Sequence, residues 1–188
     1  MGSLLRFKLD DFLSNYHLQT FIETGTARGD SLDYAAQRPE FSHLLSCEIE
    51  PLLAAGACCR FNEDARISVV RMESGLFMQM VARADLAPAF IWLDAHYPGA
   101  GFGLKDYGAA MPETVRLPLG RELDQIRQHR QGRDVILIDD LRIYETGDYE
   151  AGPLPEDAPG QPTEGGADWI RALFADTHEA RTILRDQG

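Results

Sequence analysis

Five apolar segments recur along the first 140 residues of the chain, and each ends in polar or acidic residues. They are the segments 20–25, 43–50, 66–72, 89–95 and 134–140. The last two are almost continuously apolar, which is typical of central strands that helices cover on both faces. The pattern therefore predicts five β-strands.

Segments with helical signals lie between and after these strands. A helix is expected to open near residues 30–31, and another at Pro51, because proline is tolerated at the first helical position. Apolar residues recur at i, i+4 and i+7 over 119–126, which places them on one helix face. Asp168 is expected to cap a last helix with an apolar stripe over 169–174.

Strands that alternate with helices predict an α/β fold, a Rossmann-like doubly wound domain with a mainly parallel sheet. Residues 1–188 are expected to form one domain with its core at 20–140. The segment 180–185 is expected to add a short antiparallel edge strand.

Two long segments rich in glycine and proline interrupt this pattern, at 96–117 and 145–167. Long loops in a compact domain are usually functional lids or mobile connections. The first follows a strand end, where open α/β sheets bind ligands, so it is the predicted substrate loop. The second is the predicted mobile loop.

The charge and cysteine content narrow the function classes. Thirty Asp and Glu against 18 Lys and Arg give a net charge of −12, which argues against nucleic acid or an anionic membrane as partner. Three cysteines without a second metal-ligand cluster indicate reduced thiols. With no signal-peptide pattern and no long apolar run, a cytoplasmic location is expected.

The first strand leads into the sequence E-T-G-T-A-R-G, from Glu23 to Gly29. Two glycines four residues apart let the backbone approach a ligand at a helix N-terminus. The middle glycine of the dinucleotide motif is absent, and so is the lysine of a phosphate-binding P-loop. Taken alone, the turn also fits an ordinary tight connection between a strand and a helix.

The next two strand ends carry acids as well. Glu48 and Glu50 are expected to share one strand face, about 20 residues beyond the glycines, where an acid can accept both ribose hydroxyls of an adenosine cofactor. Glu73 and Ser74 follow the third strand, where an adenine amino group could be bound. A solvated carboxylate at a strand end is the alternative for each.

These motifs, in this order, resemble the class I S-adenosylmethionine-dependent methyltransferases over about residues 20–140. The resemblance implies S-adenosylmethionine as cofactor and the fold of that class. By the same resemblance, the cofactor-binding residues are Glu23, Thr24, Gly25, Thr26, Gly29, Ser31, Glu48, Glu73, Ser74 and Asp94.

Acids also end the fourth and fifth strands, at Asp94, Asp139 and Asp140, with His96 close by. Parallel neighbours bring such side chains into one cleft, where like charges raise one another's pKa. A hard cation such as Mg²⁺ would relieve the repulsion. The alternative is that these residues cap the sheet and the next turn and bind no ion.

This arrangement resembles the metal-assisted small-molecule O-methyltransferases of the macrocin O-methyltransferase and cephalosporin-hydroxylase-like group. The resemblance implies Mg²⁺ bound by Asp94, Asp139 and Asp140, and a small-molecule hydroxyl as acceptor. The predicted catalytic residues are then His96, as the base, and Asp94. A metal-independent N-methyltransferase and a non-catalytic binding protein are the alternatives, and homo-oligomerisation is left open.

Overall fold

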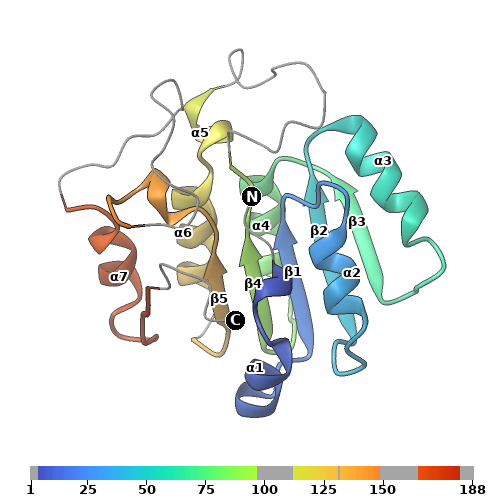
Figure 1. The fold of residues 1–188 in the computed structure, drawn as a ribbon, viewed down its shortest axis with the longest axis horizontal. Coiled ribbons are helices and arrows are strands. Elements are labelled where there is room, and N and C mark those ends of the chain that lie inside the picture. The colour runs from blue at the N-terminus through green and yellow to red at the C-terminus, as the bar shows by residue number, and fades with distance from the viewer. Residues whose placement is uncertain (1–3, 97–111, 131, 149–164, 183–188) are drawn as a thin grey trace.

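The computed structural model describes residues 4–96, 112–130, 132–148 and 165–182, without the side chain of Glu113. Within them a five-stranded parallel sheet has the order β3-β2-β1-β4-β5 and lies between two layers of helices (Figure 1). The strands are β1 (Thr20–Thr24), β2 (His43–Glu48), β3 (Ile67–Arg71), β4 (Ala89–Leu93) and β5 (Val135–Ile138).

The prediction of an α/β fold with five strands is confirmed, and each strand is one to three residues shorter than its apolar segment. The sheet is parallel throughout rather than mainly parallel. The predicted antiparallel strand at 180–185 is wrong for residues 180–182, which have no regular structure. Residues 183–185 lie outside the described part of the chain.

Helices precede, connect and follow the strands. They are η1 (Leu4–Arg6), α1 (Leu9–Tyr16), α2 (Asp30–Ala36), α3 (Pro51–Arg60), α4 (Ser74–Ala82), α5 (Glu113–Arg116), α6 (Leu119–His129), η3 (Leu141–Ile143) and α7 (Asp168–Phe174). Pro51 begins α3, as predicted. Asp168 is the first residue of α7 rather than its cap, a position that Ala167 takes. The short helix α5 lies inside the segment that the sequence predicts to be a loop.

Alternate residues of each strand point to opposite faces of the sheet, so two hydrophobic cores form. On β1, Phe21 packs with residues of η1, α1 and α2, whereas Ile22 packs with residues of α4, α6 and α7. Both side chains are fully buried. The two helix layers therefore bury both faces of β1 in the middle of the sheet.

The strand order reverses between β1 and β4. The chain runs from β1 outward to β2 and β3, and then returns to place β4 on the other side of β1. In open α/β sheets, ligands bind at the carboxyl ends of strands beside such a reversal. The fold therefore predicts a site where β1, β4 and their neighbours end.

An ion pair inside the protein joins the opposite end of the sheet to α6. Arg130 and Asp134 lie 2.6 Å apart with side chains 7% and 2% exposed. Asp134 also accepts a hydrogen bond from the backbone N–H of Ala89, the first residue of β4. The pair therefore sets where β4 begins relative to β5.

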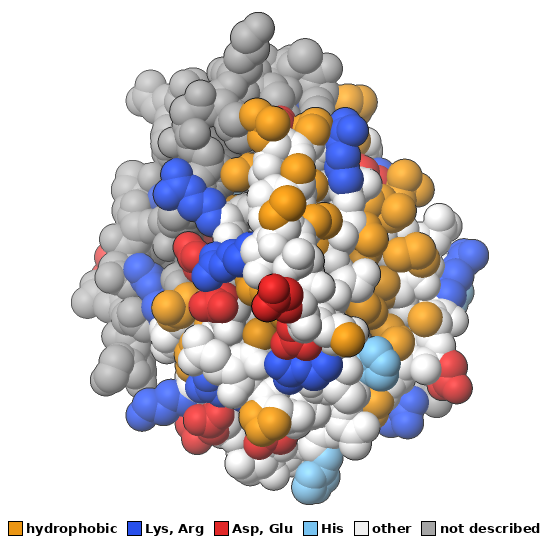
Figure 2. Space-filling view, turned by 90° about the vertical axis from the view of Figure 1, so that its right-hand side faces the viewer, with side chains coloured by type: hydrophobic (Ala, Val, Ile, Leu, Met, Phe, Trp, Pro, Cys, Tyr) orange, Lys and Arg blue, Asp and Glu red, His pale blue; other side chains and the backbone are white. Residues whose placement is uncertain are grey.

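The side of the molecule that bears α3 and β3 shows hydrophobic side chains among charged ones (Figure 2). Leu52 of α3 is 70% exposed, and Leu76 and Met80 of α4 are each 51% exposed. None of the described helices has the length and hydropathy needed to cross a membrane.

Candidate functional site

The turn after β1 depends on backbone conformations that favour glycine. Gly25 has φ +84°, and a Cβ atom there would lie 2.8 Å from the carbonyl oxygen of Asp94. Gly29 has φ +82° and occupies the N-cap position of α2. The predicted glycine turn therefore lies directly against the end of β4. This is the strand reversal, where open α/β sheets bind ligands.

Glu48 holds this turn from the end of β2. Its carboxylate accepts hydrogen bonds of 2.8 Å from the backbone N–H groups of Ala27 and Glu50, and the residue is 6% exposed. Each carboxylate oxygen has a second lone pair for a ligand hydroxyl. The expectation that Glu50 shares a strand face with Glu48 is wrong, because β2 ends at Glu48 and Glu50 caps α3 by accepting from Leu52 N–H.

Glu23 lies inside the protein below the same turn. The Ser46 hydroxyl donates a 2.6 Å hydrogen bond to Glu23, and the Ser46 and Thr26 hydroxyl oxygens are 2.5 Å apart. Burial raises the pKa of Glu23 to about 8, against the opposing effect of the Ser46 hydrogen bond. Glu23 is therefore mostly protonated at neutral pH, and it supports the turn through Ser46.

Glu73, the acid after β3, forms its own hydrogen bonds and an ion pair. Glu73 caps α4 by accepting from the N–H groups of Gly75 and Leu76, and it pairs with Arg121 at 3.2 Å. Ser74 is buried in the first turn of α4. These contacts fix Glu73 at the predicted cofactor edge, and its contact with adenine stays a prediction. Ser31, in the first turn of α2, is half-buried.

The ends of β4 and β5 bring three of the predicted metal or catalytic residues together. Donor atoms of Asp94, His96 and Asp139 all lie within 4.8 Å of one another. Burial and the neighbouring Asp139 carboxyl raise the pKa of Asp94 well above its usual range. Two carboxylates and an imidazole are a donor set that fits a divalent cation.

Asp140 has a different environment from its neighbour Asp139. The Asp140 backbone is left-handed, with φ 52°. Its carboxylate accepts a 2.8 Å hydrogen bond from Arg142 Nε and lies 3.1 Å from His96 Nε2. Although burial opposes the change, these partners hold the pKa of Asp140 at about 2. The structure therefore places Asp140 behind His96 rather than within the three-residue donor cluster.

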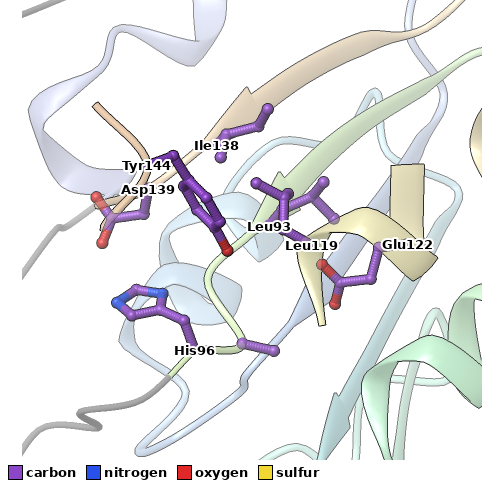
Figure 3. Close-up of a pocket in the computed structure, with 8 residues that line it drawn as sticks. Leu93, His96, Leu119, Glu122, Ile138, Asp139 and Tyr144 are labelled. Atoms are coloured by element: carbon purple, nitrogen blue, oxygen red, sulfur yellow. The ribbon is translucent and has the colours of Figure 1, made fainter. Parts of the chain in front are cut away.

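The sequence does not single out Glu122, which lines a pocket beside this cluster (Figure 3). The cavity has a volume of about 10 Å³, which is room for about one water molecule. Its lining consists of Leu93, Ala95, His96, Leu119, Glu122, Ile138, Asp139 and Tyr144. Glu122 Oε1 has no hydrogen-bond partner among the described residues. A buried carboxyl oxygen without a partner, beside a space of this size, fits a bound water or a single ligand hydroxyl.

The protonation of Glu122 is set by its surroundings. The residue is 1% exposed, and this burial raises its pKa to about 7, although the hydroxyls of Ser74 and Thr24 partly oppose the rise. Burial and Glu122 also raise the pKa of Tyr144. The sequence carried a signal for Glu122, because it occupies the core-facing stripe of α6 with Leu119, Leu123 and Ile126.

Neither a protein-family model nor a curated protein sequence matches the chain. Among solved structures, it is similar to a SAM-dependent methyltransferase from Anabaena variabilis, with a TM-score of 0.54, 14% identity, and coverage of 93% of this chain and 72% of that chain. It is also similar to the methyltransferase domain of bacterial CtHen1-CN, with a TM-score of 0.54, 10% identity, and coverage of 90% and 81%.

The chain spans a smaller part of some other methyltransferases. It covers 53% of the O-methyltransferase TomG from Streptomyces achromogenes, solved in complex with SAM, at a TM-score of 0.46 and 19% identity over 71% of this chain. At these identities the likeness defines the fold. The chain therefore has the Rossmann-like fold of class I S-adenosylmethionine-dependent methyltransferases.

Proposed function

We propose that the protein transfers a methyl group from S-adenosylmethionine to a hydroxyl of a small molecule, with a divalent cation at the acidic edge of β4 and β5. The observation that carries this proposal is the glycine turn over Asp94, which joins the predicted cofactor side to the donor cluster. The finer resemblance to the macrocin O-methyltransferase group stays a prediction.

The cofactor side is formed by the turn after β1 and by Glu48. Gly25 lets the turn lie close against the end of β4, and Glu48 keeps one lone pair on each oxygen for ribose hydroxyls. The sulfonium cofactor carries positive charge, which suits a strand edge with Asp94 and Asp139. Glu73 and Ser74 are the proposed contacts of the adenine ring.

On the acceptor side, Asp94 and Asp139 would hold the cation, close to His96. A bound divalent ion lowers the pKa of a hydroxyl that coordinates it. In the transfer, the carbon–sulfur bond of the sulfonium breaks as the oxygen–carbon bond forms in line. The sulfur keeps the electron pair, and the hydroxyl proton passes to His96 or to water beside it. The residues contribute chiefly by positioning the two reactants.

Calorimetry with S-adenosylmethionine and with S-adenosylhomocysteine tests the cofactor half of the proposal. Saturable binding of both is expected, and no binding at millimolar ligand would overturn it. A panel of small hydroxyl and amine compounds, followed by mass spectrometry for a gain of one methyl group, tests the acceptor. Methylation of amines alone would contradict the hydroxyl assignment.

A further inference from the structure

We infer that the ion at the acidic edge is a divalent transition-metal ion, such as Mn²⁺, Fe²⁺ or Zn²⁺, bound by carboxylate oxygens of Asp94 and Asp139 and by Nδ1 of His96. The inference rests on the proposed function and departs from the Mg²⁺ expected from the sequence. It also makes His96 a metal ligand, so that the acceptor proton passes to water.

The hydrogen bonding of His96 defines which ring nitrogen is available. Nε2 lies 3.1 Å from Asp140 Oδ2, and the Arg142 guanidinium donates to both oxygens of the same carboxyl group, so these oxygens act as acceptors. Nε2 must therefore carry the hydrogen. In a neutral imidazole the other nitrogen, Nδ1, then has the free lone pair that a metal ion requires.

The free nitrogen lies near the carboxylate of Asp94, and Asp139 completes the same donor cluster. His96 Nδ1 lies 3.6 Å from Asp94 Oδ1, which is too long for a hydrogen bond. Two ligand atoms at about 2.1 Å from one ion are about 3 Å apart at right angles and about 4.2 Å apart when opposite. A separation of 3.6 Å therefore fits two ligands of one ion.

The nitrogen donor decides the class of ion. Mg²⁺ favours oxygen ligands and keeps several waters, whereas imidazole suits the first-row transition metals. Asp140 adds a second indication, because metal-binding histidines usually donate their other N–H to a carboxylate. Arg142, at 2.8 Å from Asp140, keeps that carboxylate in place.

The adjoining pocket supplies an independent observation. Glu122 is 1% exposed, lines the pocket together with His96 and Asp139, and has an oxygen without a hydrogen-bond partner among the described residues. A buried carboxyl oxygen in this state needs a donor. A water or an acceptor hydroxyl bound to the ion would supply one.

Metal-stripped protein titrated with Mn²⁺, with free Mn²⁺ measured by electron paramagnetic resonance, tests the inference. One saturable site is expected, with Mn²⁺ bound at least about 10-fold more tightly than a Mg²⁺ competitor. His96→Asn should reduce this preference to near unity, and Asp140→Asn should weaken Mn²⁺ binding about 10- to 100-fold. His96→Gln serves the same purpose if His96→Asn does not fold.

His17→Asn is the matched control, because His17 is exposed at the end of α1 and its left-handed backbone suits asparagine. It should bind Mn²⁺ like the unaltered protein. Absence of saturable Mn²⁺ binding, equal affinity for Mg²⁺, or an unchanged preference in both His96 variants would overturn the inference. Cofactor calorimetry on the same samples separates the two proposals, since cofactor binding without metal binding refutes only the metal assignment.

Discussion

The α-carbon of Gly25 lies against the backbone of Asp94, so closely that a Cβ atom would stand 2.8 Å from the Asp94 carbonyl oxygen. Gly25 directly follows β1, and Asp94 directly follows β4, the neighbouring strand. This approach links the turn on the proposed cofactor side to the first residue of the donor cluster. A change at Gly25 should therefore affect both sides of the site.

Replacing Gly25 with alanine should lower both stability and cofactor affinity. The positive φ alone costs an alanine about 1–2 kcal/mol, and the contact with Asp94 must be relieved by moving backbone. We expect a loss of at least about 2 kcal/mol in urea unfolding and at least about 10-fold weaker binding of S-adenosylhomocysteine by calorimetry.

Gly56→Ala is the control for this substitution. Gly56 lies within α3, and a Cβ atom there would have no neighbour within 4 Å. Alanine should stabilise the helix by about 0.5–1 kcal/mol and leave cofactor affinity unchanged. If Gly25→Ala and Gly56→Ala had the same stability and the same affinity for S-adenosylhomocysteine, the close approach of Gly25 to Asp94 would not matter for cofactor binding.

Glu48→Gln should weaken cofactor binding. The amide keeps one accepting oxygen, so either the Ala27 N–H or the Glu50 N–H loses its partner, and the charge that would face the ribose is gone. We expect about a 10-fold rise in the dissociation constant of S-adenosylhomocysteine, which corresponds to about 1.4 kcal/mol.

Glu50→Gln is the control for Glu48→Gln, because Glu50 is a neighbouring carboxyl group with a different role. Glu50 caps α3 through a 3.3 Å hydrogen bond from Leu52 N–H, which a glutamine oxygen can still accept. Cofactor affinity should change less than about 2-fold, since the Glu50 side chain accepts from Leu52 within α3, and the Glu50 N–H that donates to Glu48 is kept in the variant. Equal weakening by both substitutions would argue against Glu48 as the ribose acid.

The sequence predicted the strands well because buried parallel strands are nearly continuous apolar runs. It failed where a strand ends and the chain turns. Glu50 looks like a strand residue by its period of two, but the chain turns into α3 first. Asp139 and Asp140 look equivalent, but the left-handed backbone of Asp140 directs its carboxylate to Arg142.

The sequence also left Glu122 and most of the predicted substrate loop at 96–117 undecided. The sequence does not predict Glu122 as a site residue, because an acid within an apolar helix stripe is usually exposed. In the structure its carboxyl group lines the pocket. The predicted substrate loop at 96–117 is tested only at its ends, because residues 97–111 lie outside the described part of the chain. The roles of the individual site residues stay predictions for the experiments above.

Asp134→Ala should destabilise the fold without a specific effect on cofactor affinity. The substitution leaves the buried Arg130 guanidinium and the Ala89 N–H without their carboxylate partner. Breaking a buried ion pair in this way costs about 3–5 kcal/mol, measurable by urea unfolding. Asp176→Ala removes the partner of Arg127 at the surface, where the loss should be at most about 1 kcal/mol. Similar losses in the two variants would contradict the structural role of the buried pair.

The stability of the protein should fall as the pH rises from about 5 to 8, because the buried acids Glu23, Glu122 and Asp94 have raised pKa values. The pKa is about 8 for Glu23 and about 7 for Glu122, against a usual value of 4.5. The folded state therefore keeps protons that the unfolded state has lost. Each group contributes a slope of up to about −1.4 kcal/mol per pH unit between the unfolded and folded pKa values.

The contributions of Glu23 and Glu122 separate near pH 7, above which Glu122 is mostly ionised in the folded protein while Glu23 still titrates. Urea unfolding at pH 5, 6, 7 and 8 should show a reduced slope throughout for Glu23→Gln, between pH 7 and 8 as well as below. Asp94, whose pKa is also raised, contributes in the same direction in every variant. Glu122→Gln should reduce the slope only below pH 7. Asp140 does not interfere, because its lowered pKa of about 2 confines its effect to pH values below about 4. A Glu23→Gln variant with the slope of the unaltered protein would show that Glu23 is ionised in the folded state.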